Sequence, residues 1–117
     1  MMKTTKLVVF YYAFNFCSNL SCDIVIPDKI LEISACTFSN CSKLTNITLP
    51  KNLWKIGSGA FYNCTGITKI ILPSSLEIID SHAFDSCSNI TNFNLPNSLK
   101  SIGSYAFSGC TGISTIN

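Results

Sequence analysis

The chain contains 117 residues, of which 47% are hydrophobic and only 12% are charged. This composition excludes a disordered polyampholyte, and the length allows one domain at most. The net charge of +2 comes from 8 basic and 6 acidic residues, without a basic block that could neutralise a run of phosphates, so no nucleic-acid partner is expected. The longest apolar run, Leu7 to Phe14, is too short to span a bilayer, which predicts no transmembrane segment.

The N-terminal stretch has two interpretations. Lys3 and Lys6 precede the apolar residues 7–16, which is the order of charged and apolar regions in a signal peptide, but a small-x-small cleavage pattern is missing. From Ala13 onward the same stretch carries a repeat motif that is found again further along the chain. Residues 1–12 are therefore expected to form either a degenerate N-terminal segment or a signal-like stretch, and both possibilities remain open.

Three residue types share one period of 23 in the rest of the chain. They are proline at 27, 50, 73 and 96, phenylalanine at 38, 61, 84 and 107, and cysteine at 41, 64, 87 and 110. A period of this length predicts a solenoid, in which no coil can bury its apolar face without stacking on a neighbour. The predicted array covers residues 13–117 as a half coil (13–20), four coils (21–43, 44–66, 67–89, 90–112) and a partial coil (113–117). Cys17 and Cys41 are 24 residues apart, which indicates one inserted residue near Ser21.

Each coil begins with a segment that alternates before its proline. In the second coil Ile47 and Leu49 are expected to face inward and Thr48 outward, the pattern of a strand buried on one side. Parallel strands are therefore predicted near 23–26, 46–49, 69–72 and 92–95. A second inward set follows in every coil, and in this coil it comprises Leu53, Ile56, Ala60, Phe61 and Cys64. The turn into the next coil is expected to use a positive φ at Gly66, Asn89 and Gly112.

A coil of the form Leu-x-x-Ile-x-Leu-Pro-x-x-Leu-x-x-Ile-Gly-x-x-Ala-Phe-x-x-Cys-Thr resembles the BspA-like leucine-rich repeat family of bacterial and protist surface antigens. The resemblance implies a right-handed solenoid with a parallel β-sheet on the concave face and extended or 3-10 segments on the convex face. It also implies a non-enzymatic protein-binding or adhesion module at the cell surface or secreted, with a cytoplasmic location as the alternative. Ile113 and Ile116 occupy inward positions without a polar capping coil, so self-association through this end is expected.

The cysteines are interpreted mainly as packing residues. Cys17, Cys41, Cys64, Cys87 and Cys110 share the inward column, where a small buried thiol is expected and disulfides along the ladder are not. Cys36 is predicted to face outward and Cys22 to lie on a strand, which makes these two the candidate reactive thiols. The spacings Cys17-x4-Cys22 and Cys36-x4-Cys41 are not the tight pairs that zinc sites favour, so no metal is predicted.

His82, the single histidine, has Asp80 and Asp85 nearby and is expected to be a solvated side chain. Catalysis would need a nucleophile and an orienting group that converge on it, and the sequence contains no G-x-S-x-G, H-E-x-x-H or phosphate-loop motif. We therefore expect no enzyme activity and no cofactor.

The variable positions on the predicted strands are the candidate binding face. Their side chains are polar and nearly uncharged with two apolar positions, which favours a protein or glycan ligand on a host or matrix surface. The alternative is a structural fragment of a longer solenoid without a ligand of its own. The candidate residues are Asp23, Val25, Asn46, Thr48, Lys69, Ile71, Asn92 and Asn94.

Overall fold

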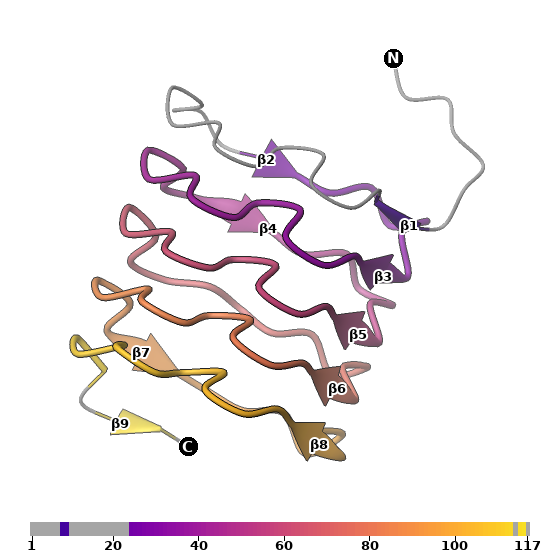
Figure 1. Cartoon of the computed structure of the whole chain (residues 1–117). Coiled ribbons are helices and arrows are strands. Elements are labelled where there is room, and N and C mark those ends of the chain that lie inside the picture. Colours follow the sequence, from indigo (N-terminus) through magenta and orange to yellow (C-terminus); the bar gives the residue numbers. More distant parts are fainter. Residues whose placement is uncertain (1–7, 10–23, 114, 117) are drawn as a thin grey trace.

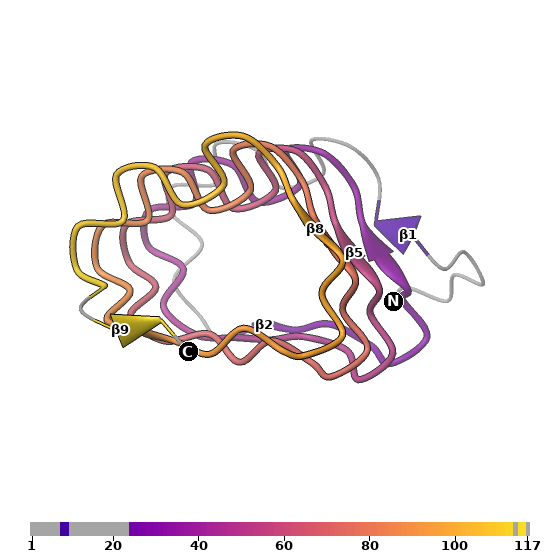
Figure 2. The ribbon, with the colours of Figure 1, turned by 90° about the horizontal axis from the view of Figure 1, so that it is seen from below.

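The computed structural model describes residues 8–9, 24–113 and 115–116 of the chain. Successive coils stack along a single axis and each makes one circuit of the solenoid (Figure 1). Seen along that axis, the coils overlay as an oval (Figure 2). Buried apolar side chains form a core inside it. The solenoid predicted from the 23-residue period is confirmed, and every strand pair is parallel.

The largest sheet has five strands. We name its wall the isoleucine wall, because three of these strands each carry a buried isoleucine. Its strands, in spatial order, are β1 (Val8–Val9), β3 (Glu32–Ile33), β5 (Lys55–Ile56), β6 (Ile78–Ile79) and β8 (Ser101–Ile102). Ile33, Ile56 and Ile79 are fully buried, so the pairing sets one apolar side chain of each coil on that of the next. Val8 pairs with Glu32, 24 residues later, which agrees with the one inserted residue.

A second wall, here named the proline wall, comprises residues 24–27, 46–50, 69–73, 92–96 and 115–116. It contains two separate two-stranded sheets, β2 (Ile24–Val25) with β4 (Ile47–Thr48) and β7 (Asn92–Phe93) with β9 (Thr115–Ile116). Three of the four predicted strand windows therefore contain a strand. The window at 69–72 does not, because its regular pairing is reduced to a single bridge position at Lys69.

The distribution of strands differs from the expectation in a second way. The longest sheet lies where extended or 3-10 segments were expected, and the wall expected to carry one continuous sheet carries two short ones. Proline accounts for part of this difference, since each proline-wall segment ends at a residue that has no N–H to give to a ladder. The same prolines begin the corner of each coil, where their carbonyls accept hydrogen bonds from Leu53, Leu76 and Leu99 at 3.1–3.2 Å.

The expected positive φ at Gly66, Asn89 and Gly112 is wrong. The left-handed residues lie in two other columns, Cys36, Gly59, His82, Tyr105 and Asn40, Asn63, Ser86, Gly109. Space is what requires glycine at position 66, because a Cβ there would lie 2.5 Å from the carbonyl oxygen of Ser42. Close approach of neighbouring coils, and not the backbone dihedral angle, selects this residue.

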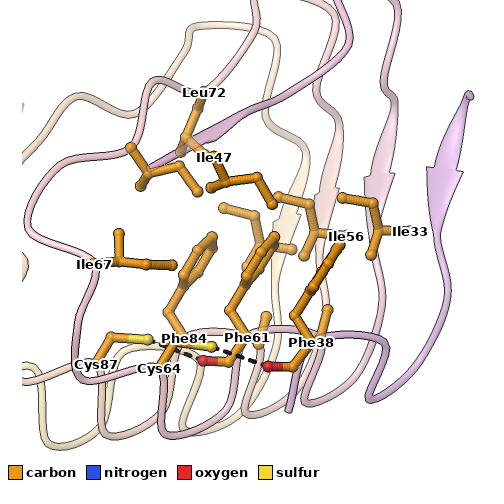
Figure 3. Close-up of a cluster of buried hydrophobic side chains, with 14 of the residues drawn as sticks. Ile33, Phe38, Ile47, Ile56, Phe61, Cys64, Ile67, Leu72, Phe84 and Cys87 are labelled. Atoms are coloured by element: carbon orange, nitrogen blue, oxygen red, sulfur yellow. Dashed lines mark hydrogen bonds between the residues drawn. The ribbon is translucent and has the colours of Figure 1, made fainter. Parts of the chain in front are cut away.

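The third wall, here named the Phe–Cys wall, comprises residues 35–41, 58–64, 81–87 and 104–110. Phe38, Phe61 and Phe84 are buried, and their rings stack nearly parallel with centroids 5.3–5.4 Å apart (Figure 3). The thiols of Cys64 and Cys87 each donate a hydrogen bond of 3.0 Å to the phenylalanine carbonyl of the preceding coil. The inward phenylalanine and cysteine columns are thus confirmed as contacts between coils.

Candidate binding groove

The candidate residues of the proline wall occupy positions that vary from coil to coil, and they point outward as predicted. The side chains of Val25, Asn46, Thr48, Lys69, Ile71 and Asn94 are all exposed. Asp23 lies outside the described residues, and of Asn92 the structure describes only the backbone, in β7. Six of the eight candidate residues therefore share one exposed surface.

A groove of about 560 Å³ runs over this surface between the first three coils. It is lined by Val25, Asn46, Ile47, Thr48, Leu49, Lys51, Lys69, Ile71 and Pro73. A smaller depression of about 90 Å³ adjoins it and shares Lys69 and Ile71 with it, and Asn94 lines its far side. Every candidate residue with a described side chain lines one of these two depressions.

The groove combines apolar and cationic character. Val25 and Ile71 are 70% and 71% exposed, in contrast to the buried Ile26, Ile70 and Leu72 beside them. Lys51 and Lys69 are exposed, and within the described part of the chain neither ammonium group forms an ion pair. None of the described residues that line the groove is acidic, so its surface carries an excess of positive charge.

Lys51 and Pro73 were not among the predicted site residues. The prediction counted only strand positions, whereas these two residues lie at the corner where the proline wall turns toward the isoleucine wall. One feature of the sequence pointed to Lys51. It directly follows Pro50, and it is a second lysine near the end of a predicted strand, in addition to Lys69. The backbone N–H of Lys51 donates to a carboxylate oxygen of Asp28 at 3.3 Å, which links two corners.

The buried thiols are poor candidates for chemistry. Burial raises the pKa of Cys87 to about 12 and that of Cys64 further still, so both remain protonated near neutral pH. Cys36 is half-buried, with its sulfur 3.3 Å from where a Cβ on Gly59 would lie. Cys17 and Cys22 lie outside the described residues.

His82 belongs to a small exposed cluster. Its Nδ1 is 2.6 Å from Oδ2 of Asp85, and its ring stacks on Tyr105 with a centroid distance of 5.1 Å. Ser86 donates to the other oxygen of Asp85 at 2.9 Å, so the carboxylate lies between imidazole and hydroxyl, and Asp80 accepts a hydrogen bond from the backbone N–H of Ser81. A histidine that does not face the hydroxyl cannot activate it as a nucleophile. Among the described residues no three metal-ligating side chains come together.

Coils of 23 residues with parallel pairing on two walls define a leucine-rich repeat solenoid. Residues 8–117 match the BspA type leucine rich repeat region in six copies, and the chain belongs to this family. The matched residues begin at Val8, and β1 already pairs with β3, so the repeat pattern reaches into the segment 1–12.

Solved structures agree with this assignment. A leucine-rich repeat protein of T. pallidum is 33% identical with a TM-score of 0.93, covering 99% of this chain and 54% of that protein. One from Bacteroides ovatus is 32% identical with a TM-score of 0.90, over 95% of this chain and 28% of that protein. The pneumococcal vaccine antigen PcpA is 28% identical with a TM-score of 0.66, over 80% and 29%. The chain thus spans about half the length of the first of these proteins and less than a third of the others.

No curated protein matches the chain. Within the residues that the structure describes, no helix is long and apolar enough to cross a membrane.

Proposed function

We propose that the chain is a non-enzymatic binding module of a cell-surface or secreted protein, and that the groove of the proline wall takes its protein or glycan ligand. One observation carries the proposal. The only positions that vary freely along the described proline wall are the outward ones, and they coincide with a 560 Å³ groove that holds two strongly exposed aliphatic side chains. Exposed apolar residues within a polar rim are typical of interaction surfaces.

The family and one solved relative support the surface location. Proteins similar to this chain include a vaccine antigen of a pathogen, and BspA type repeats match nearly all of the chain. A solenoid suits recognition because its packing residues recur in every coil while its outward residues are free to differ. The same separation supports a module without catalytic residues.

The test is an adhesion assay with substitutions that the repeat itself tolerates. Position 94 is equivalent to positions 25 and 71 and carries asparagine, so Val25→Asn and Ile71→Asn should preserve the fold. The chain is displayed on yeast, and attachment to epithelial cell layers and to coated matrix proteins is counted. We expect the double variant to lose most of the attachment that the unchanged chain confers.

The control removes an exposed ring from the Phe–Cys wall. Tyr62 is equivalent to Ser39 and Ser108. Like the double variant, Tyr62→Ser replaces an exposed hydrophobic side chain by a polar residue from an equivalent position, but it lies outside the groove. It should leave attachment unchanged. Equal attachment by all three chains would contradict the proposed groove and favour a structural segment without its own ligand.

A further inference from the structure

The backbone ladder between the second and third coils opens at the groove. On the other two walls, backbone hydrogen bonds join these two coils. The N–H of Glu77 donates to the carbonyl of Trp54 at 2.9 Å, and that of Phe61 to the carbonyl of Ala83 at 2.8 Å. On the proline wall, within the described residues, neither Ile47 nor Leu49 donates a backbone hydrogen bond to residues 68–72.

The preceding pair of coils shows which bonds are missing. There Ile24 and Ile26 donate from their N–H groups to the carbonyls of Asn46 and Thr48, each at 3.0 Å. One coil further on, the equivalent donors are Ile47 and Leu49 and the equivalent acceptors are Lys69 and Ile71. Neither bond forms, and these four residues line the groove. A ligand that covers the groove removes these backbone groups from water, so binding favours a ligand that supplies both donors and acceptors.

The size of the opening constrains how such a ligand lies. A strand inserted between two coils would need about twice the ordinary strand spacing of about 4.8 Å. The pairing of β5 with β6 on the adjacent wall holds the same two coils in register, so they cannot separate that far. An extended peptide can therefore lie along the groove and reach the backbone groups from outside.

The side chains indicate what that peptide carries. Lys51 and Lys69 favour carboxylates, and the exposed Val25 and Ile71 favour aliphatic side chains. The lining contains no aromatic ring of the kind on which a sugar ring stacks, which favours a peptide over a glycan. In an extended peptide successive side chains point to opposite faces, so acidic and aliphatic residues can be presented from one short segment.

Building on the proposed binding function, we infer that the groove binds an extended, acidic segment of a partner protein in which aliphatic residues accompany the carboxylates. Affinity comes from the aliphatic contacts and the open backbone groups. The two lysines select against basic segments.

The test selects ligands without presuming a partner. A phage library of random ten-residue peptides is selected on the 117-residue chain, and the recovered peptides are synthesised with a fluorescent label for polarisation titrations. We expect enrichment of Asp or Glu together with Val, Ile or Leu, and binding that weakens with added salt. Lys51→Glu with Lys69→Glu should reduce affinity at least about tenfold, which corresponds to about 1.4 kcal/mol.

A charge-matched control makes the result specific. Lys43→Glu with Lys100→Glu changes the net charge equally at exposed positions outside the groove, and it should leave peptide affinity unchanged. Equal losses in both double variants, enrichment of basic or aromatic peptides, or no enrichment at all would overturn the acidic-peptide inference. If attachment in the adhesion assay still depends on Ile71 while no peptide is selected, the binding function stands and a glycan becomes its ligand. If neither depends on the groove, both proposals fail.

Discussion

The Phe–Cys wall and the proline wall are built from the same coils but are connected very differently. Along the Phe–Cys wall the N–H groups of Phe38, Phe61 and Phe84 each donate to the next coil at 2.8 Å, without interruption. Along the proline wall the ladder is regular between the first two coils and absent between the next two. Exposed Ile71 lies where the ladder is absent, exposed Val25 lies on the paired strand β2 beside it, and the groove spans both.

This difference suggests that the two walls of each coil have different roles. A solenoid is stabilised mainly by the contacts between neighbouring coils, so a wall with repeated ring stacking and continuous hydrogen bonds can keep the array together. The opposite wall can then lose ladder bonds and vary in sequence without loss of the fold. Substitutions on the two walls should consequently differ in effect by several kcal/mol.

The largest effect is expected for Phe84→Ala. Phe84 is fully buried, stacks on Phe61 and Phe107, and meets Phe93 edge-on, so truncation leaves a cavity between three coils. The expected loss in the free energy of unfolding is about 3–5 kcal/mol. Urea titration followed by circular dichroism measures it. Trp54→Ala is the control, since its side chain is 38% exposed, and a loss as large as that of Phe84→Ala would show that stability does not follow the core.

The second prediction uses the buried thiols of the Phe–Cys wall. A thiol whose pKa is higher in the folded state stabilises that state fully below its ordinary pKa of 9.0 and loses this contribution as the pH rises from 9.0 toward the folded value. For Cys87, with a folded pKa of about 12, the loss is about 1.4 kcal/mol for each pH unit above 9.0. Urea titrations between pH 8 and pH 10 should therefore give a steeper decline for the unchanged chain than for Cys87→Ala. Parallel declines would mean that this thiol ionises in the folded chain.

The buried positions of Phe84 and Cys87, on which these two predictions rest, could be derived from the sequence. Phenylalanine and cysteine recur at a fixed spacing, and only an inward position explains such constancy. The break at 69–72 could not, since Lys-Ile-Ile-Leu is rich in β-branched residues and is typical of a strand. Six residues of the candidate face were correctly expected to be exposed. The groove between them depends on how two coils approach each other, and Lys51 at the corner joins it for the same reason.

A smaller effect, of opposite sign, is expected for Ser86→Asn. Ser86 has φ of 66°, and the equivalent residues one and two coils earlier, Asn63 and Asn40, are also left-handed. Asparagine tolerates this conformation better than serine, and Asn63 already donates from Nδ2 to Oδ1 of Asn40 at 2.9 Å. A third asparagine would extend this side-chain ladder and raise stability by about 0.5–1 kcal/mol. Thermal unfolding should show a higher midpoint, whereas Ser86→Ala should lower it.

The smallest change in stability is expected for Ile71→Asn, in the wall where the ladder is broken. Its side chain is 71% exposed and covers little of the core, so the free energy of unfolding should change by no more than about 0.5 kcal/mol. The adjacent Ile70 is 4% exposed, and Ile70→Asn should cost at least about 2 kcal/mol because it buries an amide and leaves a void. Urea titration of both variants compares two neighbouring positions on one segment. If Ile71→Asn were as costly as Ile70→Asn, Ile71 would be part of the core, and the groove could not be the surface on which variation is free.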